Sequence, residues 1–382
     1  MRFAFTEQQT EFRDAVRQML DRECTPADLR SAFDAFAPAS GPGATSGSGG
    51  SGPVRAESVR TPRWTALADM GVVGLTVPEM QAGLGLSELD LVLLLEEAGR
   101  AALPEPLLET TALAAPLLAR TGFETEFGTE VGALANHWLP LIAAGDVVAA
   151  VGVSGMRAIP GAVGADLYIL EHPLPEGGSE IHAVPAAEVS VSAVEALDPT
   201  RRLGTVGWTP TRATLVDAGP DADRALAVLA DRAALGTAAE LVGLTDRMIS
   251  IAADYAKERK QFGRAIGSFQ AVKHLLAGAQ VKLEFARPVT YGAAWSLAHL
   301  EPDASRRASM AKAYAAEAAT EAARVSLQVH GAIGYTWECD LHLFLKRAWA
   351  LAPAWGDAAE HRSKVLASVI AERSDIGRGR AV

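Results

Sequence analysis

A compact group of charged and aromatic residues stands out in the stretch YAKERKQFGRAIGSFQAVKHLLA, residues 255–277. Glu258, Arg259 and Lys260 are followed at once by a Gln-Phe-Gly sequence, within a segment that otherwise has helical character. A guanidinium can form two parallel hydrogen bonds to a pyrophosphate, and the Phe262 ring can lie against adenine or ribityl carbons. The cluster therefore suits a dinucleotide, although an ordinary surface ion pair of Arg259 with Glu258 or a neighbour would explain the same residues.

The chain offers little for metal or disulfide chemistry. Its two cysteines, Cys24 and Cys339, are too few and too far apart for a zinc site or a disulfide framework. We therefore expect two packed thiols and no metal site.

The overall charge and the first residues argue against several classes of partner. The formal net charge is −11, whereas nucleic acids and anionic membranes require a cationic surface. The opening sequence MRFAFTEQQTEFRDAVRQML carries charges within its apolar pattern, unlike a secretion signal or a membrane span. Because 382 residues that are 49% hydrophobic can bury a full core, we expect a cytoplasmic, globular protein with no nucleic-acid or membrane partner.

Helical patterning opens the chain. Thr6 and Gln9 form a possible capping box ahead of apolar residues at helical spacing, which predicts a helix over residues 6–22. Residues 38–53 are crowded with Gly, Ser, Pro and Ala and offer too little apolar surface to fold. This segment is predicted to be a flexible loop.

The helical pattern resumes over residues 64–75 and 87–103. Ser87 opens the second of these segments, with Asp90 three residues later, which is typical of a helix start. Residues 1–140 are therefore predicted to form an all-helical N-terminal domain.

The pattern changes twice in the remaining chain. Short β-branched runs divided by Gly and Pro occupy residues 141–220, which predicts a small antiparallel sheet or barrel. Residues 221–382 carry apolar side chains at three- and four-residue intervals, with many alanines that allow helices to approach closely. The predicted fold is mainly α with a small middle β domain and a C-terminal four-helix bundle.

These segments together resemble the acyl-CoA dehydrogenase family over nearly the whole chain. The resemblance rests on YAKERKQFGRAIGSFQAVKH at 255–274, QVHGAIGYTWECDLHLFLKRA at 328–348, LDPTRRLG at 197–204 and GLGLSELDLVLLLEEAGRA at 83–101. It implies that the middle domain is a β-barrel and that FAD lies between barrel and bundle at a subunit interface. The chain looks most similar to the bacterial branch that acts on bulky acyl-CoA esters.

The resemblance also implies that one subunit's bundle holds the pyrophosphate and adenosine of an FAD across the interface. The matching positions are Arg259 for the pyrophosphate, Phe262 for stacking, Gln270 for polar anchoring, and Gln328 with Gly331 for the AMP side. Ala332 stands where the family usually has a second glycine, which reduces how closely the backbone approaches the cofactor.

The half of the site that should hold the flavin ring departs from the family pattern. The family has a Thr-Glu-Pro segment, a Gly-Ser-Asp segment and a Trp-Ile-Thr strand there, but residues 150–170 read AVGVSGMRAIPGAVGADLYIL. Ser154 runs almost directly into the strand, Arg157 falls near the family's Trp, and Ile159 falls near its ring-facing Thr. The resemblance therefore implies that a hairpin is missing and that the ring half is damaged.

The catalytic base is the second departure. Removal of an α-proton requires a carboxylate opposite the ring, while the β-hydrogen leaves as hydride. Counting from Gln328, the family's usual Glu position is occupied by Trp355, whose indole cannot take a proton, and Asp357 replaces the usual Thr. Other members place the base on the first bundle helix, where Glu240 is the candidate; its apolar neighbours predict burial and a raised pKa. The alternative is a surface or interface carboxylate paired with an Arg.

Three functions remain open at this stage. The first is a non-catalytic partner subunit of a heteromeric dehydrogenase that completes the FAD site across an interface, similar to enzymes of bacterial steroid side-chain breakdown. The second is a self-sufficient homo-oligomeric acyl-CoA dehydrogenase with Glu240 as base, and the third is a flavin-free scaffold or binding homologue. For the enzyme readings, the resemblance implies an acyl-CoA thioester substrate and an electron-transfer flavoprotein as acceptor.

Overall fold

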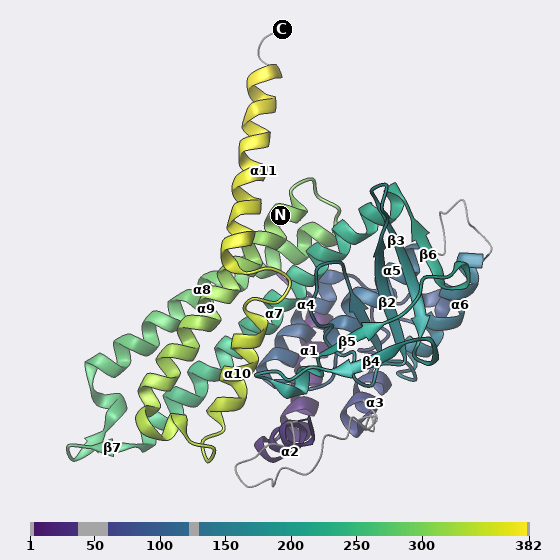
Figure 1. Cartoon of the computed structure of the whole chain (residues 1–382). Helices are drawn as coiled ribbons and strands as arrows, with labels where there is room; N and C mark the ends of the chain where they lie inside the picture. The colour runs from purple at the N-terminus through teal and green to yellow at the C-terminus, as the bar shows by residue number, and fades with distance from the viewer. Residues whose placement is uncertain (1–3, 37–59, 122–129, 380–382) are drawn as a thin grey trace. The chain divides into compact units, whose positions relative to one another are not determined.

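The computed structural model describes residues 4–36, 60–121 and 130–379 (Figure 1). The predicted flexible loop at 38–53 lies outside these ranges. The chain forms two compact units, each assembled from segments distant in sequence. The bundle unit consists of Met1–Leu20, Ser87–Ala102 and Val228–Val382, and the sheet unit consists of Asp21–Leu86 and Leu103–Ala227. The division into three consecutive domains at residues 140 and 220 stays a prediction.

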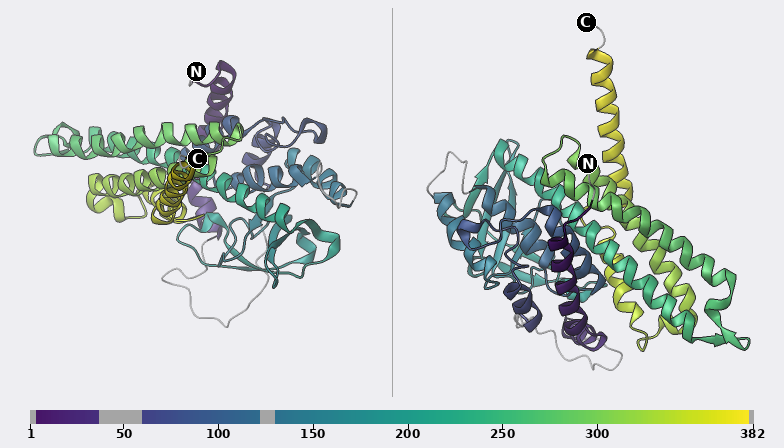
Figure 2. Two further views of the ribbon diagram at one scale, coloured as in Figure 1. Left: turned by 90° about the horizontal axis from the view of Figure 1, so that it is seen from above. Right: turned by 180° about the vertical axis from the view of Figure 1, so that it is seen from behind.

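Long helices make up the bundle unit. They are α4 (Glu88–Arg100), α7 (Pro220–Glu258, from Val228 on), α8 (Gln270–Ala298), α9 (Ala304–His330), α10 (Leu341–Leu351) and α11 (Ala358–Gly379), together with most of α1 (Glu7–Glu23). Helices α8 and α9 lie side by side along their lengths (Figures 1 and 2). The buried face of α9 is largely alanine, including Ala311, Ala315 and Ala322, which explains how closely its neighbours approach.

Both predicted capping boxes are present. The Thr6 N–H donates to Gln9 Oε1 at 2.9 Å, and the Gln9 N–H donates to Thr6 Oγ1 at 3.2 Å. At the start of α4, the Ser87 hydroxyl oxygen accepts from the backbone while Asp90 accepts from the Ser87 N–H. The sequence therefore located the first residues of α1 and α4 correctly.

The backbones of α4 and α7 touch where the two helices cross. A Cβ atom at Gly99 of α4 would overlap the backbone of Glu240 on α7, and a Cβ atom at Gly243 of α7 would overlap the Glu96 carbonyl oxygen on α4. Each helix thus offers one glycine to the other's main chain. Any side chain at either position would force the helices apart.

The sheet unit contains shorter elements. Its helices are α2 (Pro26–Phe36), α3 (Pro62–Asp69), α5 (Ala115–Thr121) and α6 (Glu130–Ala143), with a π-helical segment at Leu108–Ala114. The helix predicted over 64–75 ends early, at Asp69, because Gly71 adopts a left-handed conformation with φ 79° and turns the chain.

Six strands of the sheet unit form two sheets. Strands β1 (Ala149–Gly152), β2 (Leu167–Pro173), β3 (Ser179–Pro185) and β6 (Leu215–Ala218) make one sheet in the order β1-β2-β3-β6, and β4 (Ser190–Ala193) pairs with β5 (Gly204–Gly207). All six lie within residues 141–220, the segment predicted to form the small β domain. Tyr168 of β2 lies in the core, where its hydroxyl donates to the Ala162 carbonyl at 2.6 Å and burial raises its pKa to about 12.

The strands do not close into a barrel within the described residues, and one strand pair is parallel. Strand β1 runs parallel to β2, with Ala149 opposite Leu167, because the connection between them crosses back before β2 begins. At the other edge of β1, the Thr110 hydroxyl accepts from the Ala149 N–H and donates to its carbonyl, both at 3.1 Å. A helical side chain therefore covers the edge that a closing strand would need, and the expectation of a β-barrel is corrected to an open sheet.

Three further observations bear on the sequence-based expectations. No helix in the described part of the chain combines the length and the apolar character that crossing a membrane requires. Cys24 and Cys339 are free thiols, and burial raises the pKa of Cys24 to about 12. Across residues 4–36, 60–121 and 130–379, no group of three or more His, Cys, Asp or Glu side chains is arranged to hold a metal ion.

The glycine contact between α4 and α7 leads to a stability prediction. Replacing Gly243 with Ala should lower the free energy of unfolding by about 3 kcal/mol, because the added methyl overlaps the Glu96 carbonyl. Gly278, also inside a helix, has open space at the Cβ position, so Gly278→Ala should raise stability by about 1 kcal/mol. Urea unfolding of both variants tests the pair; equal effects would contradict the crossing geometry.

Candidate functional site

The Arg-x-Gln-Phe-Gly cluster lies on a hairpin at the end of α7. The helix stops at Glu258, and the chain forms two short antiparallel strands, β7 (Lys260–Gln261) and β8 (Arg264–Ala265). Phe262 and Gly263 occupy the turn with φ 50° and 77°, the left-handed pair that a two-residue hairpin requires. The expectation that helical character continues to Phe262 is therefore wrong, since the glycine permits a tight reversal instead.

The turn exposes an aromatic ring to solvent. Phe262 is 92% exposed although it is a large apolar residue in a backbone conformation that non-glycine residues rarely adopt. Its ring meets the edge of Phe269 at 6.2 Å between centroids, and the Arg264 guanidinium lies 4.2 Å over the Phe269 ring. A strained turn thus holds Phe262 at the tip of the hairpin. One side of its ring contacts Phe269, and the rest is exposed to solvent.

Arg259 links the end of α7 to this hairpin. Its N–H donates to the Tyr255 carbonyl at 2.9 Å, and its carbonyl accepts from the Ile266 N–H at 2.8 Å. The side chain is exposed, and within the described ranges no carboxylate pairs with its guanidinium. The neighbouring Lys257 pairs with Asp254 at 2.7 Å, so the ion pair beside the hairpin does not involve Arg259, and the role of Arg259 stays a prediction.

Gln270 is the first residue of α8. Its side chain is exposed, and no side chain caps the first turn of the helix, whose N-cap residue is Phe269. The N–H groups and the positive end of the helix dipole at such a terminus favour an anion. Gln270 therefore lies where a polar or anionic group would meet both a side-chain amide and main-chain donors.

The second predicted segment ends α9. Gln328 is exposed in the last turn, Gly331 leaves the helix with φ 63°, and Ala332 follows on an exposed 3-10 turn. The Tyr255 ring stacks on His330 with centroids 4.3 Å apart and an interplanar angle of 17°. This stack joins the last turns of α7 and α9, so both predicted cofactor segments lie at the same end of the bundle unit.

Glu240 lies elsewhere on α7. It precedes the end of the helix at Glu258 by about 27 Å, from the rise of 1.5 Å per residue. Its neighbours Ala238, Ala239, Leu241 and Val242 are all buried, but Glu240 itself is only half-buried. The predicted burial of Glu240 is therefore corrected to partial exposure.

Trp355 occupies a tightly held turn between α10 and α11. It has φ 58°, and Gly356 follows with φ 101°. Lys312 of α9 is fully buried, and its ammonium donates to the carbonyls of Ala352 at 2.7 Å and Gly356 at 2.8 Å. His361 Nε2 lies 3.0 Å from the Trp355 carbonyl. Buried donors from two helices thus fix the main chain of the turn.

Asp357 has a structural role at the start of α11. Its Oδ1 accepts from the N–H groups of Ala359 at 2.8 Å and Glu360 at 2.9 Å, and Glu360 Oε2 accepts from the Asp357 N–H at 2.8 Å. This is a reciprocal helix cap. Asp357, which replaces the family's Thr, therefore caps the first turn of α11.

The region expected near the flavin ring belongs to the sheet unit. Ile159 forms an isolated bridge with Gly204 and packs against the core of that unit, and a Cβ atom at Gly152 would overlap its side chain. Arg157 is exposed, and the Ser154 N–H donates to Glu171 Oε2 at 2.8 Å. Ile159 therefore serves as a core residue where the family pattern has a hydroxyl.

Two features were missed by reasoning from the sequence. The Tyr255–His330 stack was not predicted, because the two residues are 75 positions apart and a contact at that separation leaves no local pattern in the sequence. Lys312 was also missed, but it left a signal: it is the one cation in the run SMAKAYAAEAA, where the surrounding alanines indicate a buried face.

The chain belongs to the acyl-CoA dehydrogenase family. Its residues 53–146 match the N-terminal domain of acyl-CoA dehydrogenases, and residues 225–370 match the C-terminal domain. Acyl-CoA dehydrogenase IpdE2 of Mycobacterium tuberculosis is 32% identical over 286 residues, which cover 75% of this chain and 79% of that protein.

Solved structures of two-chain family members are also similar. One is a variant of the Tcur3481-Tcur3483 steroid ACAD, and another is the ChsE4-ChsE5 complex from Mycobacterium tuberculosis. Each has a TM-score of 0.78 and 25% identity, covering 97% of this chain and 99% of the matched chain. The predicted family resemblance is confirmed, and the similarity extends to the steroid-directed branch.

The buried histidines lead to a prediction for acid stability. Burial lowers the pKa of His182, His330 and His361 below the ordinary value of 6.5. The unfolded chain therefore binds more protons once the pH falls below 6.5, so stability that is present above this pH should be lost as the pH drops. Urea unfolding at pH 7.5 and 5.5 measures the loss.

A matched pair of variants isolates the histidine contribution. His361→Gln should reduce the difference in stability between the two pH values, because the amide can still donate to the Trp355 carbonyl but cannot titrate. The exposed His274 provides the control, since His274→Gln should leave the difference unchanged. A pH difference that survives in His361→Gln at full size would show that His361 does not contribute to it.

Proposed function

We propose that this chain is the partner subunit of a heteromeric, FAD-dependent acyl-CoA dehydrogenase and that its bundle completes an FAD site across a subunit interface. The observation that supports this most is the tip of the hairpin. Arg259 is exposed with no carboxylate partner in the described ranges, and Phe262 is exposed on a left-handed turn. A strained turn and an exposed apolar ring both cost stability, so Arg259 and Phe262 in this position suit the binding of a ligand from outside the chain.

The residues at this end of the bundle unit fit the pyrophosphate and adenosine of FAD in their chemistry. The roles proposed for them are pyrophosphate binding by Arg259, stacking by Phe262, polar anchoring by Gln270, and contacts to the AMP side by Gln328, Gly331 and Ala332. The flavin, when bound, would accept the hydride from the β-carbon of an acyl-CoA thioester. This chain's own contribution is to bind and orient the cofactor's diphosphate and adenosine.

Two features support a two-chain assembly. Trp355 stands where much of the family has its base, and its turn is fixed by Lys312 and His361, so no carboxylate is offered from that position. Family members with a similar fold have been solved as two-chain complexes, and one of them is described as a steroid enzyme. We therefore propose a bulky, steroid-like acyl-CoA as substrate, an electron-transfer flavoprotein as acceptor and the cytoplasm as the compartment.

A second candidate function is a self-sufficient homo-oligomer in which Glu240 is the base. The contact between Gly99 and the Glu240 backbone favours it, because α4 holds the main chain of α7 directly at this residue. The half-buried side chain could both reach a substrate and exchange protons. A flavin-free scaffold is the outcome if the protein binds no FAD in any assembly.

Removing the Arg259 guanidinium should weaken cofactor retention. Arg259→Ala should cost about 1.5–3 kcal/mol of FAD binding in the assembled enzyme, because charge-assisted bonds to the pyrophosphate are lost. The bound-flavin absorbance per subunit after gel filtration measures the effect. Arg307→Ala is the control, since Arg307 pairs with Asp303 at the opposite end of α9. Unchanged flavin content in Arg259→Ala would show that the assignment is wrong.

The isolated chain should dehydrogenate acyl-CoA thioesters poorly. We expect a rate at least ~10²-fold below that of the complex with its partner, because a positioned base and ring geometry are both needed. Purified chain reconstituted with FAD is assayed with aliphatic and steroid CoA thioesters and a ferrocenium acceptor. Robust turnover that Glu240→Gln abolishes would establish the homo-oligomeric enzyme instead, and a colourless complex with the partner would favour the scaffold.

A further inference from the structure

We infer that Arg287 of α8 is a positioning residue for Glu240, acting by clamping α4 and α8 onto the segment of α7 that carries it. This inference rests on the second candidate function, in which Glu240 is the base. It is built from contacts within the bundle unit alone.

The main chain at Glu240 is in direct contact with α4. Gly99 lies against the Glu240 backbone so closely that no Cβ atom fits between them, and three residues later Gly243 lies against the Glu96 carbonyl and the Arg100 N–H. One turn of α7 is thereby wedged against one turn of α4. The direction in which the Glu240 side chain leaves the helix depends on how firmly α4 is held in place.

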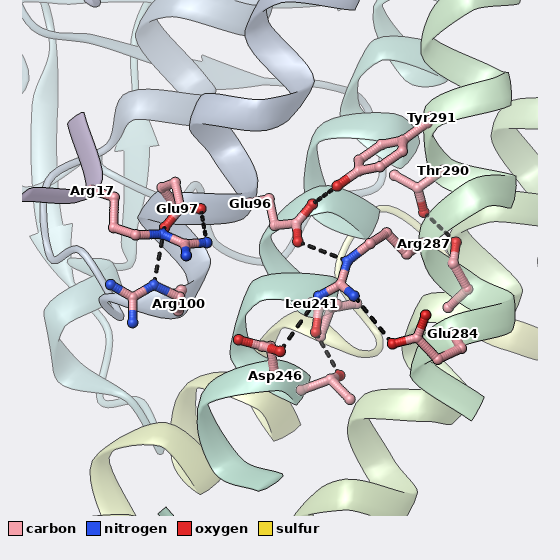
Figure 3. A network of polar contacts seen from close by, with 12 residues as sticks. Arg17, Glu96, Glu97, Arg100, Leu241, Asp246, Glu284, Arg287, Thr290 and Tyr291 are labelled. Atoms are coloured by element: carbon pink, nitrogen blue, oxygen red, sulfur yellow. Dashed lines mark hydrogen bonds and ion pairs between the residues drawn. The ribbon is translucent and has the colours of Figure 1, made fainter. Parts of the chain in front are cut away.

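Arg287 holds α4 and α7 at once, as Figure 3 shows. Its Nε donates to Glu96 Oε1 on α4 at 3.0 Å, and its Nη2 lies 3.4 Å from Asp246 Oδ1 on α7. Glu96 is 7% exposed, and its second oxygen accepts from the Tyr291 hydroxyl at 2.6 Å. The guanidinium therefore joins three helices within two turns of Glu240.

Glu97, the next residue of α4, is braced from the other side. Arg17 of α1 donates to both of its oxygens, at 2.8 and 2.5 Å, and Arg100 Nε donates at 2.9 Å (Figure 3). Glu97 is 1% exposed, and a carboxylate buried there without such partners would destabilise the protein. Arg17 and Arg287 thus contact neighbouring residues of α4, and Arg287 also lies 3.4 Å from Asp246 of α7.

The contacts of Arg287 differ from a surface ion pair because they can fix the separation of two helices. An exposed pair adds little to stability, whereas a guanidinium shared between a buried carboxylate and a second helix fixes their separation. A candidate base must be placed to within a fraction of an ångström to act on a substrate proton. Loss of the shared guanidinium should loosen the α4 contact at Glu240 without removing any group that would touch the substrate.

Two measurements on matched variants test the inference. In the assembled enzyme, Arg287→Met should lower kcat at least ~10-fold and leave KM within ~2-fold, while Arg287→Lys, which keeps the charge, should recover most of the rate. In the chain alone, hydrogen exchange of residues 236–248 should be faster in Arg287→Met than in the parent. Arg307→Met, which breaks a surface pair with Asp303, should change neither measurement.

The variant Glu240→Gln tests the premise of the inference, and several outcomes would contradict it. Glu240→Gln should lower kcat at least ~10²-fold; full activity in that variant, or an assembled enzyme with no turnover, would show that Glu240 is not a base to be positioned. Faster exchange in Arg287→Met with an unchanged kcat would make the network purely structural. If Arg287→Met does not fold, Glu96→Gln, which keeps a carbonyl oxygen for Tyr291, replaces it. Flavin content, measured in every variant, separates these failures from a failure of the FAD assignment.

Discussion

The bundle unit depends on the contact between the main chains of α4 and α7. Because Gly99 and Gly243 leave no room for side chains at the crossing, the residues beside them on α4 must point sideways. Two of these neighbours, Glu96 and Glu97, are carboxylates that lie almost fully buried. A buried charge is costly unless it is paired, so the crossing in turn requires the arginines that α1 and α8 supply. The close approach and the charge network are therefore parts of one constraint.

The same logic separates two kinds of arginine in this unit. Arg17 and Arg287 have buried carboxylate partners, and their removal would leave uncompensated charge inside the protein. Arg259 is exposed, and no carboxylate pairs with it in the ranges that the structure describes. A cation beside a strained and exposed aromatic turn adds nothing evident to the fold. Ion pairs within the chain therefore explain Arg17 and Arg287, whereas Arg259 remains available to bind a ligand.

Features set by residues close together in the sequence were predicted correctly. Features set by contacts between distant residues were not. The capping residues Thr6 and Ser87 located helix starts because a cap acts within one turn. The barrel expectation failed because closure depends on what covers the edge of β1, and Thr110 is 39 residues away. Burial of Glu240 was overestimated for a similar reason. Apolar neighbours in sequence point to other faces of a helix, so they do not decide the exposure of the residue between them.

The turn at Trp355 bears on how the family fold is used here. If this region had simply decayed after loss of a base, its carbonyls would have no reason to stay paired. Instead the carbonyls of Ala352 and Gly356 accept from the buried Lys312 ammonium, His361 reaches that of Trp355, and Asp357 caps the next helix. Unpaired buried carbonyls would each cost stability, so the turn is maintained as a structural element without a carboxylate. A well-held turn without a carboxylate is what the proposed partner subunit requires, because its base would then come from another helix or another chain.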